Sequence, residues 1–148
     1  MHSLTLKMTI AGGALLCAMT AASAQLANNK VGVVVNGLRS DSGVVRCGLY
    51  AGPAGFRQPG REFRGAVGRI NGQQATCVFG NLPAGNYAVA VFHAERGETQ
   101  IKTGAFGKPE QGYGFSNNPS SGFGPPDYSS AAFTYSGGTQ TLPVTLHY

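Results

Sequence analysis

The sequence contains no tryptophan and little charge. Only 11% of its 148 residues are Asp, Glu, Lys or Arg, against about a quarter in an average soluble domain. Its longest apolar run, residues 8–22, is shorter than the roughly 20 residues that span a bilayer, which argues against a transmembrane helix. Glycine is abundant, with 23 residues, but it follows no G-X-Y period, so a collagen-like chain is excluded. The length and the many turn formers predict one turn-rich all-β domain.

Motifs of common catalytic and nucleotide-binding sites are also missing. The sequence contains no G-x-S-x-G, no H-E-x-x-H and no phosphate-binding glycine loop ending in G-K-S or G-K-T. Beyond His2, the histidines are His93 and His147, which are too few by themselves for a metal site. We therefore predict no catalytic residues, no metal site and no cofactor.

One enzymatic alternative stays open, a small hydrolase or metal-dependent enzyme that uses His93 and loop carboxylates. His93 and Ser116 border the same long loop, and Glu95 and Glu110 could serve as acid and base if that loop folded them together. Such an enzyme requires a pocket in which His93, a carboxylate and Ser116 converge. A histidine and a serine that satisfy nearby backbone groups are the more ordinary interpretation.

The first 24 residues have the three-part layout of a secretory signal peptide, with small residues up to Ala24. Leu16 precedes Cys17, whereas lipoprotein signals have a small residue before the acylated cysteine. We predict cleavage after Ala24 and a single domain over residues 25–148. The protein is expected to be periplasmic or secreted, with no transmembrane anchor after cleavage and no nucleic acid as partner.

Cleavage would leave two cysteines, Cys47 and Cys77. Both lie in strand-like runs, where period-two alternation places their sulfurs on the apolar side. An exported chain with two such cysteines predicts one Cys47–Cys77 disulfide. Two buried free thiols remain the alternative.

Seven strand-like runs follow the signal segment, separated by turn formers. They favour a seven-stranded antiparallel β-sandwich. The run 86–92 is apolar on both faces, which predicts a central strand covered on both sides. Pro143 in the last run predicts an edge or a bulge. The runs are 31–35, 44–50, 63–70, 75–79, 86–92, 131–135 and 139–147.

A stretch of nearly 40 residues between Phe92 and Ala131 shows no clear strand, which is long for an ordinary connection. It is rich in glycine and aromatic residues, so we expect one long, compact loop packed on the sandwich. Loops on a rigid sandwich often carry recognition, and aromatic rings supply contact area. The alternative is that the loop belongs to the core. The candidate binding residues are Tyr113, Phe115, Asn117, Asn118 and Phe123.

Positive charge is concentrated in the first half of the expected domain, and the whole chain carries a formal net charge of +5. Arg57, Arg61, Arg64 and Arg69 lie close together in the sequence. Arg61 and Arg64 are therefore a second candidate binding patch, for an acidic partner or an anionic envelope component. A solvated face that maintains solubility is the alternative.

Several strings together resemble a bacterial family of small secreted proteins, the domain-of-unknown-function family numbered 2141. The resemblance implies a prealbumin-like or immunoglobulin-like sandwich and no assigned activity. We therefore expect an uncharacterised exported β-sandwich that serves as a non-enzymatic binding or interaction module of the cell envelope, with a partner still unknown. The strings are NGL at 36–38, VRCGLY at 45–50, FRGA at 63–66, FGNLPAGNYAVAVFH at 79–93, GYGFSNN at 112–118, GPP at 124–126 and AF at 132–133.

The segment after His93 departs from the resembled family. There the family often has an Asp/Asn/Gly-rich stretch that looks like a calcium loop. Here Ala94 supplies no side-chain ligand, and Arg96 and Lys102 bring positive charge. Glu95 and Glu98 beside two cations favour a salt-bridged turn over a calcium site.

Overall fold

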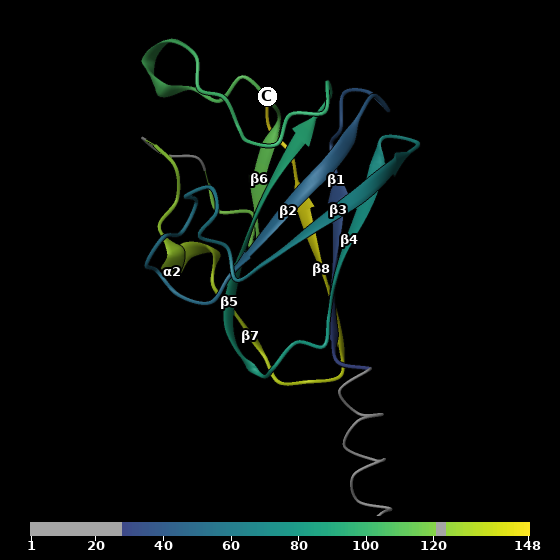
Figure 1. Cartoon of the computed structure of the whole chain (residues 1–148), viewed down its shortest axis with the longest axis vertical. Helices are drawn as coiled ribbons and strands as arrows, with labels where there is room; N and C mark the ends of the chain where they lie inside the picture. Colours follow the sequence, from purple (N-terminus) through teal and green to yellow (C-terminus); the bar gives the residue numbers. More distant parts are fainter. Residues whose placement is uncertain (1–27, 121–123) are drawn as a thin grey trace, which may run out of the picture.

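The computed structural model describes residues 28–120 and 124–148, so the predicted signal peptide and Phe123 lie outside the described residues. The described chain is all-β, apart from the short helical turns η1 and α2 (Figure 1). Its elements are β1 (Lys30–Asn36), β2 (Val44–Tyr50), β3 (Arg64–Asn71), β4 (Gln74–Gly80), β5 (Gly85–Ala94), η1 (Ala105–Gly107), β6 (Tyr113–Phe115), α2 (Tyr128–Ala131), β7 (Phe133–Tyr135) and β8 (Thr139–Thr145).

The strands form one nearly closed, barrel-like sheet in the order β6-β5-β2-β3-β4-β1-β8, with β7 paired to β5. The ends of this order meet where Tyr113 and His147 exchange two backbone hydrogen bonds of 2.9 Å. Pro143 lies in β8, at an end of the order, as expected for a residue that cannot donate to a sheet ladder.

The sheet is mixed, which corrects the prediction of an antiparallel seven-stranded sandwich. β8 runs parallel to β1, from the pair Lys30–Thr139 to the pair Asn36–Thr145. The eighth strand is the short β6, which lies inside the segment expected to be a loop. Alternation of apolar residues defines each strand locally, but it carries no information on which distant strand becomes the neighbour or in which direction it runs.

The core fills the inside of this sheet because inward residues alternate with outward ones along each strand. Val31, Val33 and Val35 of β1 are fully buried, and β4 alternates strictly between exposed and buried residues. β5 is covered on both faces where Val89 joins the inner core and Ala88 joins a second cluster outside the sheet, while Ala90 and Phe92 on its outer face stay partly exposed.

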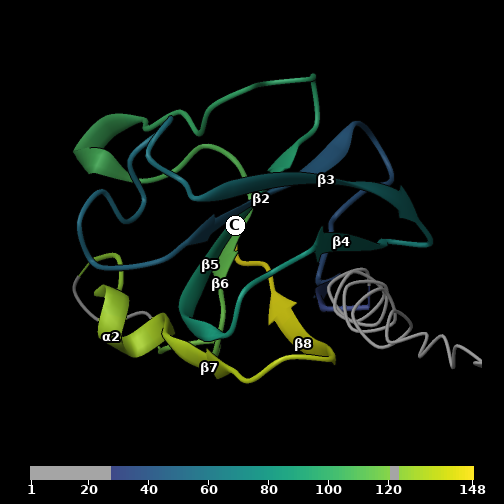
Figure 2. The same ribbon diagram turned by 60° about the horizontal axis from the view of Figure 1, so that its bottom comes forward.

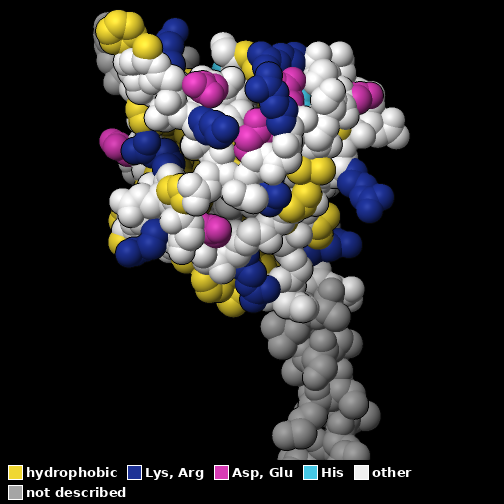
Figure 3. All heavy atoms as spheres, turned by 45° about the horizontal axis from the view of Figure 1, so that its top comes forward, with side chains coloured by type: hydrophobic (Ala, Val, Ile, Leu, Met, Phe, Trp, Pro, Cys, Tyr) yellow, Lys and Arg dark blue, Asp and Glu magenta, His cyan; other side chains and the backbone are white. Residues whose placement is uncertain are grey.

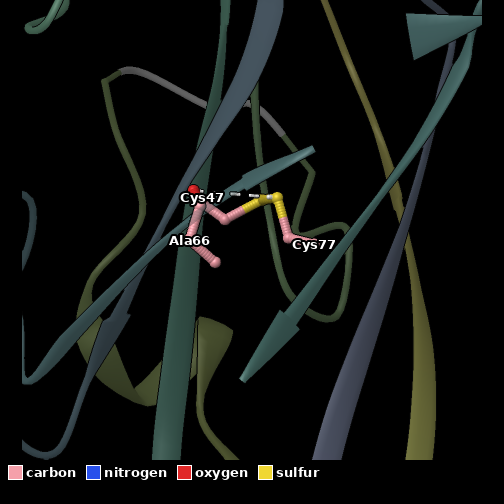
Figure 4. The surroundings of a disulfide bond; sticks show 3 residues. All are labelled: Cys47, Ala66 and Cys77. Carbon is pink, nitrogen blue, oxygen red and sulfur yellow. Dashed lines mark hydrogen bonds between the residues drawn. A yellow bond between two sulfur atoms is a disulfide. The ribbon is translucent and has the colours of Figure 1, made fainter. Parts of the chain in front are cut away.

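Cys47 of β2 and Cys77 of β4 lie at disulfide-bonding distance in the core, as predicted (Figure 4). Their Cα atoms are 6.4 Å apart, although β3 lies between their strands in the sheet order. β3 pairs with β4 only next to their common turn, and the two strands then diverge (Figure 1). The disulfide therefore ties together two strands that backbone pairing does not join.

The long segment after β5 is ordered into short elements rather than one Gly/aromatic loop, which corrects that expectation. It contains η1, β6 and α2, and a backbone bridge between Thr103 and Pro109 closes a hairpin around η1. Residues 131–135 were expected to be a strand, but Ala131 ends α2 and β7 starts at Phe133. The hydrogen-bond partners of these short pieces are distant in sequence, so local periodicity does not reveal them.

Candidate binding surface

The outer face of the sheet β3-β2-β5-β6 carries a row of three small residues and one phenylalanine. Gly65 pairs with Gly48, Gly48 with Ala90, and Ala90 with Phe115. Directly opposed residues in antiparallel strands share a face, so these four form one line across four strands. Their neighbours along the strands, such as Cys47, belong to the inner core, which places this row on the outside.

A second row lies beside the first, two residues further along each strand. It consists of Val67, Arg46, Phe92 and Tyr113, again joined by direct register pairs. Val67 is 55% exposed, and the other three are half-buried. We call the two rows together the outer strip, residues Gly65, Gly48, Ala90, Phe115, Val67, Arg46, Phe92 and Tyr113.

One end of the outer strip is bounded by the loop after β2 and by α2. Phe56 from that loop and Ala131 of α2 cover Tyr50 and Ala88, the next outward residues of β2 and β5. Phe56 also packs against Phe115, with ring centroids 6.1 Å apart. Figures 1 and 2 both show α2 and this loop on the same side of the sheet.

The other end is bounded by the segment between β5 and β6. The Arg46 guanidinium donates from Nε to the Glu98 carbonyl over 2.7 Å. Buried Gln111 accepts from the Lys102 backbone N–H at 2.8 Å and donates to the Gln100 carbonyl, so the segment is tied down at several points. The outer strip is thus an open stretch of sheet between two ordered coverings.

The predicted binding residues divide between this surface and the scaffold. Tyr113 and Phe115 lie on the outer strip, half-buried, with ring centroids 6.0 Å apart and edge-to-face geometry. Asn117 donates from Nδ2 to the Ala132 carbonyl at 2.7 Å, and Asn118 accepts from the Thr145 backbone N–H at 2.8 Å. Both asparagines have positive φ, so they hold the turn after β6.

The predicted arginine patch is exposed but lies off the outer strip. Arg64 donates to the Gly80 carbonyl of β4 over 3.2 Å, and its guanidinium lies 5.4 Å from the centre of the Phe63 ring. Arg61 is exposed in the loop that carries Phe56, and its side chain packs beside Gly55. The two predicted basic residues thus lie next to the strip, not on it.

Arg46, Gly48 and Phe92 are not among the binding residues predicted from the sequence. In the run VRCGLY, the alternation that directs Cys47 inward also directs Arg46 and Gly48 outward together, and it is the sequence signal for these two residues. The pairing with Phe92 depends on the β2–β5 register, which alternation cannot supply.

His93 is fully buried at the end of β5, and both ring nitrogens have protein partners. Nδ1 lies 2.7 Å from the Tyr148 hydroxyl and Nε2 lies 2.7 Å from the Ser42 carbonyl. A carbonyl only accepts, so Nε2 carries a proton and donates to it. His93 therefore hydrogen-bonds a backbone carbonyl and the Tyr148 hydroxyl, which is a structural role rather than a catalytic one.

Ser116 lies away from His93. It bonds to the backbone of Val89 and donates to the Ala131 carbonyl over 2.5 Å. Val89 precedes His93 by four residues on β5, a separation of roughly 13 Å at strand spacing. The structure therefore does not bring Ser116 and His93 together. Within residues 28–120 and 124–148, no group of three or more His, Cys, Asp or Glu residues is placed to hold a metal ion.

Glu95 forms an ion pair, though with Arg39 from the β1–β2 loop instead of its expected neighbours. Arg39 donates from Nε and Nη2 to the two carboxylate oxygens, and Ser40 donates to Oε1. These hydrogen bonds, first of all those from Arg39, lower the pKa of Glu95 from 4.5 to about 2. Glu98 accepts from the Arg96 backbone N–H, which also lowers the pKa of Glu98.

A polar cleft of about 590 Å³ opens beside this ion pair, between the chain after β5 and the start of β6. Arg39, Arg96 and Lys102 line it together with Glu95 and Glu110, so both signs of charge are present. Figure 3 shows Lys and Arg side chains beside Asp and Glu side chains at this end of the molecule. The cleft is a mixed-charge surface, not a field of one sign.

These features define a small all-β domain with a disulfide-tied core and an apolar strip on its outer face. The chain belongs to the family described as "Uncharacterized protein conserved in bacteria (DUF2141)", whose profile matches residues 33–143. No curated protein and no solved structure matches the chain. No helix in the described part of the chain is long and apolar enough to cross a membrane.

Proposed function

We propose that this protein is a non-enzymatic binding module exported to the cell envelope, periplasmic or secreted. The observation that carries the proposal is the outer strip, where Tyr113, Phe115 and Phe92 stay half-exposed on rigid strands between two ordered coverings. Exposed aromatic side chains on a rigid scaffold are typical of recognition surfaces. Gly65 beside them has open space above its backbone, so a ligand can approach the backbone there.

The contacts of the titratable groups favour a binding role over a hydrolytic one. Both ring nitrogens of His93 are engaged by protein groups, and Glu95, 3.9 Å from Nδ1, is held by Arg39. Ser116 is committed to backbone partners elsewhere on β5. These contacts support structural roles for the residues that the hydrolase alternative would use.

Export is supported by the Cys47–Cys77 pair, because disulfides persist in oxidising compartments. The signal peptide over residues 1–24 is part of the same proposal. Fractionation of producing cells and N-terminal sequencing of the product test it. A chain beginning at Gln25 outside the cytoplasm is expected, and an uncleaved cytoplasmic chain would contradict the proposal.

The binding role is tested with two matched glycine variants. A Cβ added at Gly65, on the strip, or at Gly80, on β4, meets no heavy atom within 4 Å, so both sites accept valine sterically. Neither residue has positive φ. We expect immobilised wild-type and Gly80→Val to retain the same component from envelope extract, and Gly65→Val to lose it. If both variants retain the component equally, the outer strip is not the binding surface.

A further inference from the structure

Resting on the proposed binding role, we propose that the outer strip takes a small amphiphilic anion, an acyl chain with one anionic head group, and that Arg46 is its counter-ion. The chain lies over Gly65 of the first row and Val67 of the second row, and the head group meets the guanidinium of Arg46, which pairs with Val67. Three observations carry the assignment: the size of the strip, the surroundings of Arg46 and the bare floor beside it.

The size of the strip favours a small ligand over a protein. Four strands span three spacings, about 14 Å, and two rows lie about 7 Å apart along the strands. The exposed area is therefore on the order of 100–250 Å², well below the roughly 800 Å² per partner of a stable protein interface. The coverings at both ends, which include Phe56 and Gln111, limit the approach of a broad partner.

Arg46 supplies the charge. It is half-buried in the row between Val67 and Phe92, and its Nε is used by the Glu98 carbonyl. Across the described parts of the chain, Glu95 forms an ion pair with Arg39, and no carboxylate forms one with Arg46. A guanidinium with an oriented Nε and no acidic partner, set among apolar side chains, is suited to a ligand carboxylate or phosphate.

The floor of the strip beside Arg46, meaning the exposed backbone at Gly65, is low and apolar. A Cβ at Gly65 would meet open space, whereas one at Gly48 would lie 3.2 Å from the Tyr50 ring, which therefore closes the floor on that side. Half-buried Phe92 and Phe115 border the floor in the two rows. An acyl chain that covers this backbone removes apolar surface from water, which favours binding at about 25 cal/mol per Å².

The ligand class is tested by titration calorimetry with dodecanoate and dodecyl phosphate below their micelle concentrations. The neutral glycerol ester of dodecanoate and acetate are the comparison ligands. We expect saturable one-to-one binding of an anionic amphiphile, no binding of acetate, and binding of the ester weaker by about tenfold or more. The two anions distinguish a carboxylate from a phosphate head group. Equal binding of anion and ester would overturn the role of charge.

Variants then locate the site. Gly65→Val should abolish binding of the anionic amphiphile, while Gly80→Val should leave it unchanged. Arg46→Met should reduce the preference for the anion over the ester to none, and Arg46→Lys should restore most of it. Thermal unfolding of each variant confirms that it is folded. Unchanged affinity in folded Gly65→Val or Arg46→Met would overturn the proposal.

Failure here is distinguishable from failure of the binding role itself. If no amphiphile binds but envelope extract still yields a component that Gly65→Val loses, the strip binds a different ligand class and only the present inference falls. If that component is a protein, the strip binds a macromolecule and not a small amphiphile. If neither amphiphile nor extract component depends on Gly65, both proposals fall together.

Discussion

Single residues in this protein are held mostly by backbone groups from distant segments. Asn117 and Asn118 bond to α2 and β8 regions, and Ser116 bonds to β5. Such side chains replace ladder hydrogen bonds where the short strand β6 ends. Glu95 differs, because its partners Arg39 and Ser40 are side chains and its ionisation affects their contacts directly.

Glu95 should contribute to acid unfolding. Its pKa is about 2 in the folded state against 4.5 ordinarily, so the folded state favours the ionised form. The stabilisation is present above pH 4.5 and is lost as the pH falls toward 2. Glu95→Gln should flatten the decline of the unfolding free energy in this window, measured by urea denaturation at successive pH values. Glu62→Gln at an exposed position is the control, and an equal slope in both variants would refute the assignment.

Among the elements, the β3–β4 hairpin shows how a turn is fixed from outside. Gly72 and Gln73 occupy its two central positions with φ of 60° and 58°, a pattern typical of a type I′ turn. The Asp41 carboxylate accepts from both backbone N–H groups, at 3.2 and 2.6 Å. The β1–β2 loop therefore anchors this turn from outside the hairpin.

Asp41→Ala should weaken this hairpin. Two hydrogen bonds to a charged acceptor are lost at an exposed site, so we expect the unfolding free energy to fall by about 2 kcal/mol. Amide exchange at Gly72 and Gln73 should accelerate more than exchange at the core strands. Asp127→Ala is the matched control. Unchanged exchange in Asp41→Ala would show that the turn keeps its conformation unaided.

At the scale of the whole molecule, the barrel-like sheet has a weak seam between β3 and β4, which pair only at Ile70–Ala75 and Asn71–Gln74. The Cys47–Cys77 bridge lies across this seam. The disulfide thus holds β2 and β4 together where few backbone hydrogen bonds cross the seam, whereas backbone hydrogen bonds join the other neighbouring strands.

Removing the disulfide should therefore destabilise the entire fold. A closed loop with a sequence separation of 30 residues contributes about 3 to 4 kcal/mol in the chain-entropy model. The double variant Cys47→Ala, Cys77→Ala should lose about that much in denaturant unfolding, and reductant should have little further effect on it. The reduced wild-type protein is the matched comparison, and it should lose as much unfolding free energy as the double variant. Equal stability of oxidised and reduced wild-type would contradict the bridge.

Much of the fold could be predicted because its signals are local. The alternating valines of β1, the inward cysteines and the doubly apolar β5 follow from residue spacing. The β1–β8 parallel pairing and the strand β6 could not, since β1 and β8 are far apart in the sequence and β6, with only 3 residues, is defined by its pairing with β5. For the site, Tyr113 and Phe115 were found as aromatics, whereas Arg46 required the register of three strands to be recognised.

The parallel pairing of β1 with β8 has a mechanical consequence. The chain enters β1 at Lys30 and leaves β8 at Thr145, at opposite ends of the paired strands. Tension applied between these two points pulls the strands along each other in shear. The ladder between Lys30 and Asn36 then carries the force across many hydrogen bonds at once instead of opening them one after another. A domain held at one side and pulled at the other would resist extension through this pair.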